Sequence, residues 1–151
     1  AKFVSQVDFA IYKDKYNPRK GDVLLTNIGT IGKTVLVQED EELLIAWNVF
    51  LIGVNDKVQS KFLNYYLQRL DGLNFYENLM TGNATKFVNK TSLSEIEILS
   101  PPLPEQQKIA SILSSMDSHI EEKQRKLEQT QSLKKSLMQD LLTGKVRVTV
   151  N

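Results

Sequence analysis

Residues 101–144 read PPLPEQQKIASILSSMDSHIEEKQRKLEQTQSLKKSLMQDLLTG, and this stretch decides the fold. It predicts one long helix over residues 105–143, because Pro104 suits the first turn of a helix and Glu105 places a negative charge at the positive end of the helix dipole. No further Gly or Pro occurs before Gly144, a residue type that ends helices in the left-handed conformation. About 39 residues give a helix of roughly 58 Å. Covering a small core does not require such a length, so the helix must serve another purpose.

Apolar residues recur along this helix at alternating steps of four and three. That spacing is a heptad pattern, in which one stripe of a helix packs against another helix. Lys123, Thr130 and Lys134 interrupt the stripe, and the middle of the helix is strongly polar. We therefore expect the helix to require a partner helix. The expected helix-partner interface, called the seam, consists of Ile109, Leu113, Met116, Ile120, Leu127, Leu137 and Leu141.

Composition bounds the remaining possibilities. A chain of 151 residues with 41% hydrophobic and 25% charged residues fits one globular domain plus the long helix. The absence of Cys excludes disulfides and Cys-ligated metal sites and fits a cytoplasmic protein. The longest apolar run, residues 43–54, is too short to span a bilayer, and there is no signal peptide, so we expect no membrane association. The chain starts at Ala1 on a strand-like stretch, which is typical of an excised or truncated piece.

Net charge is close to neutral in both parts of the chain. Residues 1–100 carry 11 Lys and Arg against 12 Asp and Glu, and residues 101–151 carry 8 against 6. This balance disfavours a polycation that binds nucleic acid by charge alone. Any contact with DNA must therefore be local and specific in shape.

The first half of the chain has the composition of β-structure. We predict strands over residues 1–12, 23–27 and 33–38, with a Gly-rich turn at 27–32. Residues 43–54, LLIAWNVFLIGV, are the most hydrophobic strand candidate, and we expect them at the centre of the core.

From residue 56 the apolar period becomes helical. Ser60 can cap a helix whose apolar side is formed by Phe62, Leu63, Tyr66, Leu67 and Leu70. We predict a short second helix over 74–80, a polar loop over 81–91, one helical turn at 92–95, and strands over 96–100 and 145–150. The result is an α+β protein with a partial small mixed domain (1–100), a Pro hinge (101–104), one long coiled-coil-forming helix (105–143) and a strand-like tail (144–151).

Two short motifs invite catalytic interpretations. GTIGKT at residues 29–34 resembles part of a phosphate-binding loop, but that pattern requires Gly where Asn27 stands, and a helix must follow it. Here two predicted strands flank the segment, so we interpret it as a hairpin turn. SPPL at residues 100–103 is superficially similar to the catalytic tetrapeptide of amino-directed DNA methyltransferases, but Leu103 replaces the aromatic residue, and we interpret the segment as a hinge.

No constellation of nucleophile, base and orienting residue appears elsewhere. His119 is the single histidine and lies on the long helix, where it is exposed or flanks the seam. The acidic run at 39–42 is interpreted as a solvated turn. We therefore expect a non-catalytic protein without a metal.

Three polar groups remain: Thr26 with Asn27, Asn48, and the loop over residues 81–90. Asn, Thr and Lys are residue types that contact base edges and phosphates. The alternative interpretation, an ordinary polar loop, is the one that composition alone favours.

Five segments together resemble the specificity (S) subunit of type I restriction-modification systems. They are GDVLLTNIGTIGK, the Asn in a central strand, TGNATKFVN, SEIEILSPPLPEQQKIASIL, and a Leu-containing helix that ends LMQDLLTGKVRV. The resemblance implies a target recognition domain followed by a spacer helix, without catalytic activity. It implies that the domain reads one half of a split site in double-stranded DNA. It also implies docking of the methyltransferase (M) subunits, which use S-adenosylmethionine, and through them the ATP-driven restriction (R) subunits, so this chain needs no cofactor of its own.

The sequence departs from that family in two respects. It has one recognition domain where the usual subunit has two, and the resemblance implies that the first several dozen residues of this domain are missing. Pairing of the long helix with a copy of itself would restore two-fold symmetry, so we expect a homodimer.

The resemblance assigns DNA-facing positions to residues that match the family motifs. Asn83 is the best candidate for a base edge, because a side-chain amide can bind adenine through two hydrogen bonds. Lys33, Lys86 and Lys90 suit phosphates. The full expected set is Thr26, Asn27, Lys33, Asn48, Thr81, Asn83, Thr85, Lys86 and Lys90.

Two other functions stay open at this point. One is a scaffold that dimerises and binds only the methyltransferase subunit without reading DNA. The other, a nucleotide-binding or methyl-transfer enzyme, depends on GTIGKT and SPPL, and both motifs are incomplete.

Overall fold

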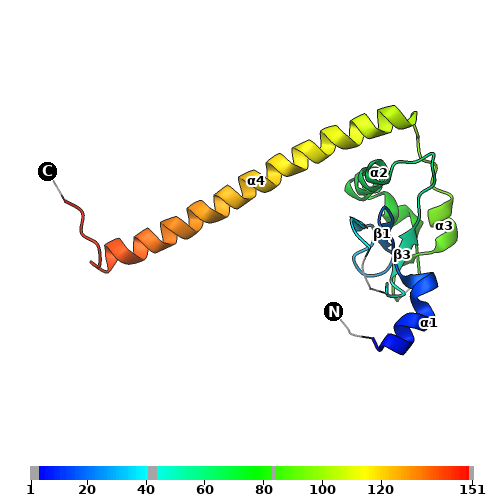
Figure 1. Cartoon of the computed structure of the whole chain (residues 1–151), viewed down its shortest axis with the longest axis horizontal. Helices are drawn as coiled ribbons and strands as arrows, with labels where there is room; N and C mark the ends of the chain where they lie inside the picture. Colours follow the sequence, from blue (N-terminus) through cyan, green and yellow to red (C-terminus); the bar gives the residue numbers. More distant parts are fainter. Residues whose placement is uncertain (1–3, 41–43, 83, 150–151) are drawn as a thin grey trace. The chain divides into compact units, whose positions relative to one another are not determined.

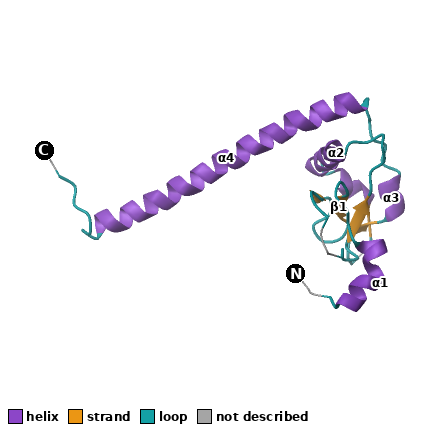
Figure 2. Ribbon diagram, in the orientation of Figure 1, coloured by secondary structure: helices purple, strands orange, loops and turns teal. Residues whose placement is uncertain are grey.

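The computed structural model describes residues 4–40, 44–82 and 84–149. The chain divides into two compact units, residues 1–110, called the head, and residues 111–151. The head contains a three-stranded sheet, a small hairpin and short helices, and the long helix α4 continues into the second unit (Figures 1 and 2). The predicted fold class, a small mixed α/β domain followed by one long C-terminal helix, is confirmed.

The three-stranded sheet is antiparallel and has the order β2-β1-β3. Its central strand is β1 (Val23–Thr26), which pairs with β2 (Thr34–Leu36) on one side and β3 (Val49–Ile52) on the other. Successive side chains of a strand point to opposite faces. Val23 and Leu25 therefore share one face, and both are fully buried.

The prediction for residues 43–54 is wrong in both extent and place. Residue 43 lies outside the described residues, and within 44–54 only Val49–Ile52 form a strand. This strand lies at the edge of the three-stranded sheet and is half-buried, and Trp47 is 81% exposed. Hydrophobicity indicates burial, but the pairing order decides which strand is central, and here β1 has a neighbour on each side.

Helix α2 (Ser60–Gly72) covers the sheet with the predicted apolar side. Its cap is Gln59 rather than Ser60, because the Gln59 side chain accepts a hydrogen bond from the Phe62 N–H at 2.6 Å. A 3₁₀ helix, η1 (Phe75–Leu79), follows where a short helix was predicted. The buried core cluster consists of Val23, Leu25, Leu63, Leu67, Leu70, Tyr76 and Val88.

The strand predicted over residues 1–12 is wrong where the structure describes it. Helix α1 (Gln6–Tyr16) begins after Ser5, whose hydroxyl accepts a hydrogen bond from the Asp8 N–H at 3.1 Å. The Ser5 cap stabilises a helix here, whereas the β-type composition of this segment lacks the alternation of apolar and polar residues that is typical of a strand. None of the helix's residues is buried.

The rest of the head is formed by short elements. Strands β4 (Met80–Thr81) and β5 (Phe87–Val88) form a hairpin within the predicted polar loop, and α3 (Lys90–Ser94) contains the predicted helical turn. Residues 96–100 are not a strand, although Ile96 and Ile98 pack against the core.

Helix α4 (Leu103–Leu142) has 40 residues and is continuous. It ends as predicted, with Gly144 at φ +73°. The described part of the predicted terminal strand is not a strand: the Val146 N–H donates to the Asp140 carbonyl at 3.0 Å, and Lys145 pairs with the Asp140 carboxylate at 3.1 Å. Within the described residues, no helix is both long and apolar enough to cross a membrane.

Candidate nucleic-acid interface

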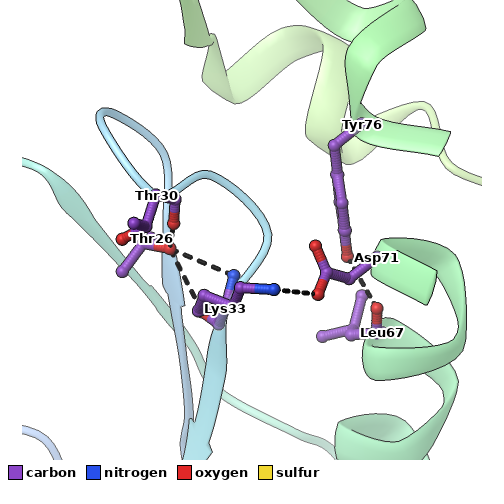
Figure 3. Close-up of polar contacts among 6 residues, drawn as sticks. All are labelled: Thr26, Thr30, Lys33, Leu67, Asp71 and Tyr76. Atoms are coloured by element: carbon purple, nitrogen blue, oxygen red, sulfur yellow. Dashed lines mark hydrogen bonds and ion pairs between the residues drawn. The ribbon is translucent and has the colours of Figure 1, made fainter. Parts of the chain in front are cut away.

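The turn between β1 and β2 is held together by Thr26. Its N–H donates to the Lys33 carbonyl at 2.9 Å, and its carbonyl accepts from the Gly32 N–H at 2.9 Å. Its hydroxyl donates to the Thr30 carbonyl and accepts from the Lys33 N–H (Figure 3). The Thr26 side chain thus stabilises the turn and is already hydrogen-bonded there.

Asn27 joins three segments that are far apart in the sequence. Its N–H donates to the Asn48 carbonyl at 3.0 Å, and its own carbonyl accepts from the Val88 N–H at 3.0 Å. Next to it, Ile28 and Phe87 form an isolated β-bridge. The turn 27–33, Asn48 and the hairpin 80–88 therefore meet at one place, called the polar junction below. Asn27 is 7% exposed, and its side-chain oxygen has no hydrogen-bond partner among the described residues.

The β4–β5 hairpin ends in a tight loop. Gly82 has φ +99°, and a Cβ at this position would lie 2.4 Å from the Thr85 carbonyl oxygen, so the conformation requires Gly. The Thr81 hydroxyl donates to the Phe87 carbonyl at 3.4 Å. Thr85 and Lys86 are exposed.

Lys33 extends from the first turn toward the end of α2. Its ammonium pairs with the Asp71 carboxylate at 2.5 Å, and the Lys33 and Asp71 side chains are 64% and 28% exposed (Figure 3). Beside this pair, the Tyr76 hydroxyl donates to the Leu67 carbonyl at 3.2 Å. Burial, and secondarily the negative charge of Asp71, raise the pKa of Tyr76 above its ordinary value, so this phenol stays protonated.

The structure brings most of the expected DNA-facing residues to the polar junction but leaves them with different roles. The hydroxyls of Thr26 and Thr81 bond within their own turns, and Lys33 is paired with Asp71. Asn83 lies outside the described residues. The residues at the polar junction are Thr26, Asn27, Lys33, Asn48, Thr81, Thr85 and Lys86.

Lys90 has a different position. It is the first residue of α3 and lines an apolar cavity of about 350 Å³ between β3, α2 and α3. Among the described residues there is no cluster of three His, Cys, Asp or Glu side chains that could hold a metal ion.

Three residues near the polar junction were not predicted. The sequence does not single out Asp71, and it places Tyr76 only within a predicted short helix. Trp47, next to Asn48, is 81% exposed, which is unusual for so large an apolar side chain. A single Trp placed beside an Asn candidate was the signal that could have identified it.

A small α/β head with a polar junction of Asn, Thr and Lys, continued by a 40-residue helix with an exposed apolar stripe, defines a recognition module on a long helical support. The chain belongs to the family described as the type I restriction modification DNA specificity domain, whose model matches residues 2–130. The sequence resemblance to that family is thereby confirmed.

Known relatives carry the same description. The specificity subunit of the MjaX type I restriction enzyme of Methanocaldococcus jannaschii is 34% identical over 145 residues, which cover 83% of this chain and 32% of the relative. The MjaVIII specificity subunit of the same organism is 32% identical over 146 residues, covering 91% of this chain and 34% of the relative. The chain spans about a third of the length of these relatives.

Solved structures of low sequence identity have the same fold. The S subunit of a type I restriction-modification system from M. genitalium has a TM-score of 0.66 at 22% identity, with 84% of this chain and 34% of that chain covered. A structure from a study of complex assembly in the type I restriction-modification system has a TM-score of 0.69 at 23% identity, with 83% and 30% covered. At these identities the likeness concerns the fold.

Proposed function

We propose that this chain is a DNA-sequence-reading specificity module of a type I restriction-modification enzyme. It reads one half of a split site in double-stranded DNA with the polar junction and pairs through α4 with a copy of itself. The observation that carries the proposal is the convergence of the turn 27–33, Asn48 and the hairpin 80–88 on Asn27, in a chain that belongs to the specificity-domain family.

The residues at the polar junction divide into two kinds of DNA contact. Lys86 is exposed and suits a phosphate, a contact that positions a protein without reading sequence. The amides of Asn48 and Asn83 suit base edges in the major groove. For Asn83 this assignment rests on the sequence motif alone.

In this proposal the chain has no catalytic role and works in the cytoplasm. It docks the methyltransferase subunit, which uses S-adenosylmethionine, and through it the ATP-dependent restriction subunit. The competing function, a scaffold that binds the methyltransferase subunit without reading DNA, makes a different prediction for the experiment below.

The test is a mobility-shift titration, with and without the methyltransferase subunit, on duplexes selected from a randomised library and on random DNA. Asn83→Ala should lose affinity for the selected duplex by about 5- to 150-fold and leave binding to random DNA unchanged, because a bidentate base contact is worth about 1–3 kcal/mol. Lys86→Ala should weaken binding to the selected duplex and to random DNA equally. It should also lower the slope of log affinity against log salt by about 0.9. The matched control is Lys61→Ala, at the opposite end of α2 from Asp71.

The single Trp gives a second readout of the same titration. Trp47 adjoins Asn48, so its fluorescence should change when DNA occupies the polar junction. Equal losses on selected and random DNA for Asn83→Ala contradict its assignment to a base. Absence of DNA binding under both conditions, with the methyltransferase subunit still bound, favours the scaffold.

The Lys33–Asp71 pair leads to a separate prediction. Asp71→Asn should raise affinity for all DNA by about two- to fivefold at low salt, because it removes a carboxylate that repels phosphates and leaves the Lys33 charge uncompensated. Lys33→Met should lower the affinity for all DNA, because it removes the positive charge. Asp56→Asn, the same charge change in the turn before α2, is the control. If Asp71→Asn weakens binding as Lys33→Met does, the pair serves only to hold the turn.

A further inference from the structure

Trp47 lies on a tight turn that is bonded to the central strand of the sheet. The Val49 N–H donates to the Ala46 carbonyl at 3.1 Å, so these residues and the two between them form a β-turn. Trp47 and Asn48 occupy its two central positions. The Asn48 carbonyl accepts from the Asn27 N–H at 3.0 Å, and Val49 begins β3. The backbone that carries the indole ring is therefore fixed to the polar junction.

The ring of Trp47 itself is left uncovered. The side chain is 81% exposed, although the Ile45 N–H, just before the turn, is also held by the Tyr16 carbonyl at 2.9 Å. Among the described residues of this turn and of the polar junction, Trp47 is the only large apolar side chain that is exposed. A large side chain on a fixed backbone loses little conformational freedom on binding, and Trp is a common anchor residue at interfaces. Trp47 thus has the properties of an anchor for a partner that lies over the polar junction.

The neighbouring residue indicates what the ring contacts. In the proposed function the amide of Asn48 binds a base edge in the major groove, so Trp47 enters the same groove. Consecutive Cα atoms are about 3.8 Å apart and base pairs about 3.4 Å, so the two side chains reach the same or adjacent base pairs. Base edges in this groove present hydrogen-bonding groups, and the C5-methyl group of thymine is the apolar group among them. The indole ring has one N–H donor and is otherwise apolar, so it complements this methyl group.

We propose that Trp47 is a specificity-determining residue whose ring packs on the C5-methyl group of a thymine, in the base pair contacted by Asn48 or in the adjacent one. The inference rests on the proposed function and deepens it, because it adds an apolar contact to the amide contacts of the same site. Uracil has the hydrogen-bonding groups of thymine and lacks only the methyl group. Exchange of thymine for uracil therefore removes this contact and leaves the base pairing intact.

The experiment uses fluorescein-labelled duplexes that carry the half-site selected by the unmodified chain, with each thymine replaced in turn by deoxyuridine. Fluorescence anisotropy measures affinity, and the titrations are made with and without the methyltransferase subunit. At one thymine the replacement should lower the affinity of the unmodified chain about fourfold, the ratio that corresponds to about 0.8 kcal/mol for one buried methyl group. Replacement of the other thymines should have smaller effects.

Variants of the ring connect this effect to Trp47. Trp47→Ala should bind the thymine and deoxyuridine duplexes equally at that position, because the side chain that contacts the methyl group is absent. Trp47→Phe keeps an aromatic ring and should retain a preference for thymine. The matched control is Leu99→Ala, which removes an apolar side chain that is 83% exposed and lies outside the turn and the polar junction. It should keep the full fourfold preference.

The outcomes separate this inference from the proposed function. If the selected half-site is bound but contains no thymine, or if deoxyuridine lowers the affinity of the unmodified chain and of Trp47→Ala equally at every position, Trp47 does not read a methyl group, while the proposed function stands. If Trp47→Ala keeps the thymine preference and instead binds the methyltransferase subunit more weakly, the ring contacts protein and the inference is wrong. If the chain binds no duplex under either condition, the proposed function fails and this inference fails with it.

Discussion

Replacing Leu113 and Ile120 with Asp should convert the proposed dimer of this chain to a monomer. Both side chains lie in the seam of α4, where they are 38% and 59% exposed in the single chain. Fully burying a Leu or Ile side chain stabilises an interface by about 1.5–3 kcal/mol, and a two-fold pair contains each position twice. Burying an Asp there adds a further cost. We therefore expect the dissociation constant of the dimer to rise by at least about a thousandfold.

Light scattering after size-exclusion chromatography measures this directly as a fall from twice the mass of the chain to the mass of one chain. The matched control places the same two charges on α4 away from the seam, as Ser115→Asp with Ser132→Asp, both exposed. That variant should remain dimeric. Should the seam variant keep the dimer mass, the helices do not pair through this stripe.

A second consequence concerns the helix itself. Lys123, Thr130 and Lys134 interrupt the seam in its middle, and an isolated helix with so polar a centre is marginal in water. The monomeric variant should therefore lose helical circular dichroism from this region, whereas the head should keep its own unfolding transition.

The long helix was predictable because every signal that specifies it is local. The seam repeats over short steps, and Gly144 ends the helix where the sequence places it, with φ +73°. The same holds for the turn between β1 and β2, where Gly29 and Gly32 both adopt positive φ. Such features need only neighbouring residues to form.

Pairing between distant segments was not predictable in the same way. The Lys33 ammonium finds Asp71, 38 residues later, and Gln106 binds groups 47 and 49 residues earlier. The position of a Lys or Gln in the sequence does not indicate which distant residue it will contact. Gln106 in a polar helix resembles a surface residue, although it is fully buried. The candidate site followed the same rule: its segments were identified, but the roles of Thr26 and Lys33 became evident only from their contacts.

Gly32→Ala should destabilise the head far more than Gly29→Ala, although both change a Gly of the same turn. At Gly32, where φ is +85°, an added Cβ would lie 2.5 Å from Tyr76 Cδ2 and 3.0 Å from the Asp71 carboxylate. At Gly29, where φ is +78°, no atom lies within 4 Å of the added Cβ. The two positions share the backbone penalty of a left-handed residue and differ in the space available.

The backbone penalty alone is about 1 kcal/mol, which is the cost expected for Gly29→Ala. Overpacking against the ring of Tyr76 adds about 1–3 kcal/mol for Gly32→Ala, because Tyr76 is buried and its hydroxyl is held by the Leu67 carbonyl. For a domain of this size about 1 kcal/mol corresponds to a shift of about 4–8 °C. Calorimetry should therefore give a loss of about 5 °C for Gly29→Ala and about 10–25 °C for Gly32→Ala.

The comparison also tests whether the turn lies against Tyr76 and Asp71, the arrangement that determines where Lys33 points. Near-ultraviolet circular dichroism of the tyrosines should change for Gly32→Ala and stay constant for Gly29→Ala. Equal losses of melting temperature for the two variants would mean that the turn does not contact Tyr76. In that case the Lys33–Asp71 pair could not hold the lysine at the polar junction, and the charge predictions for that pair would fail with it.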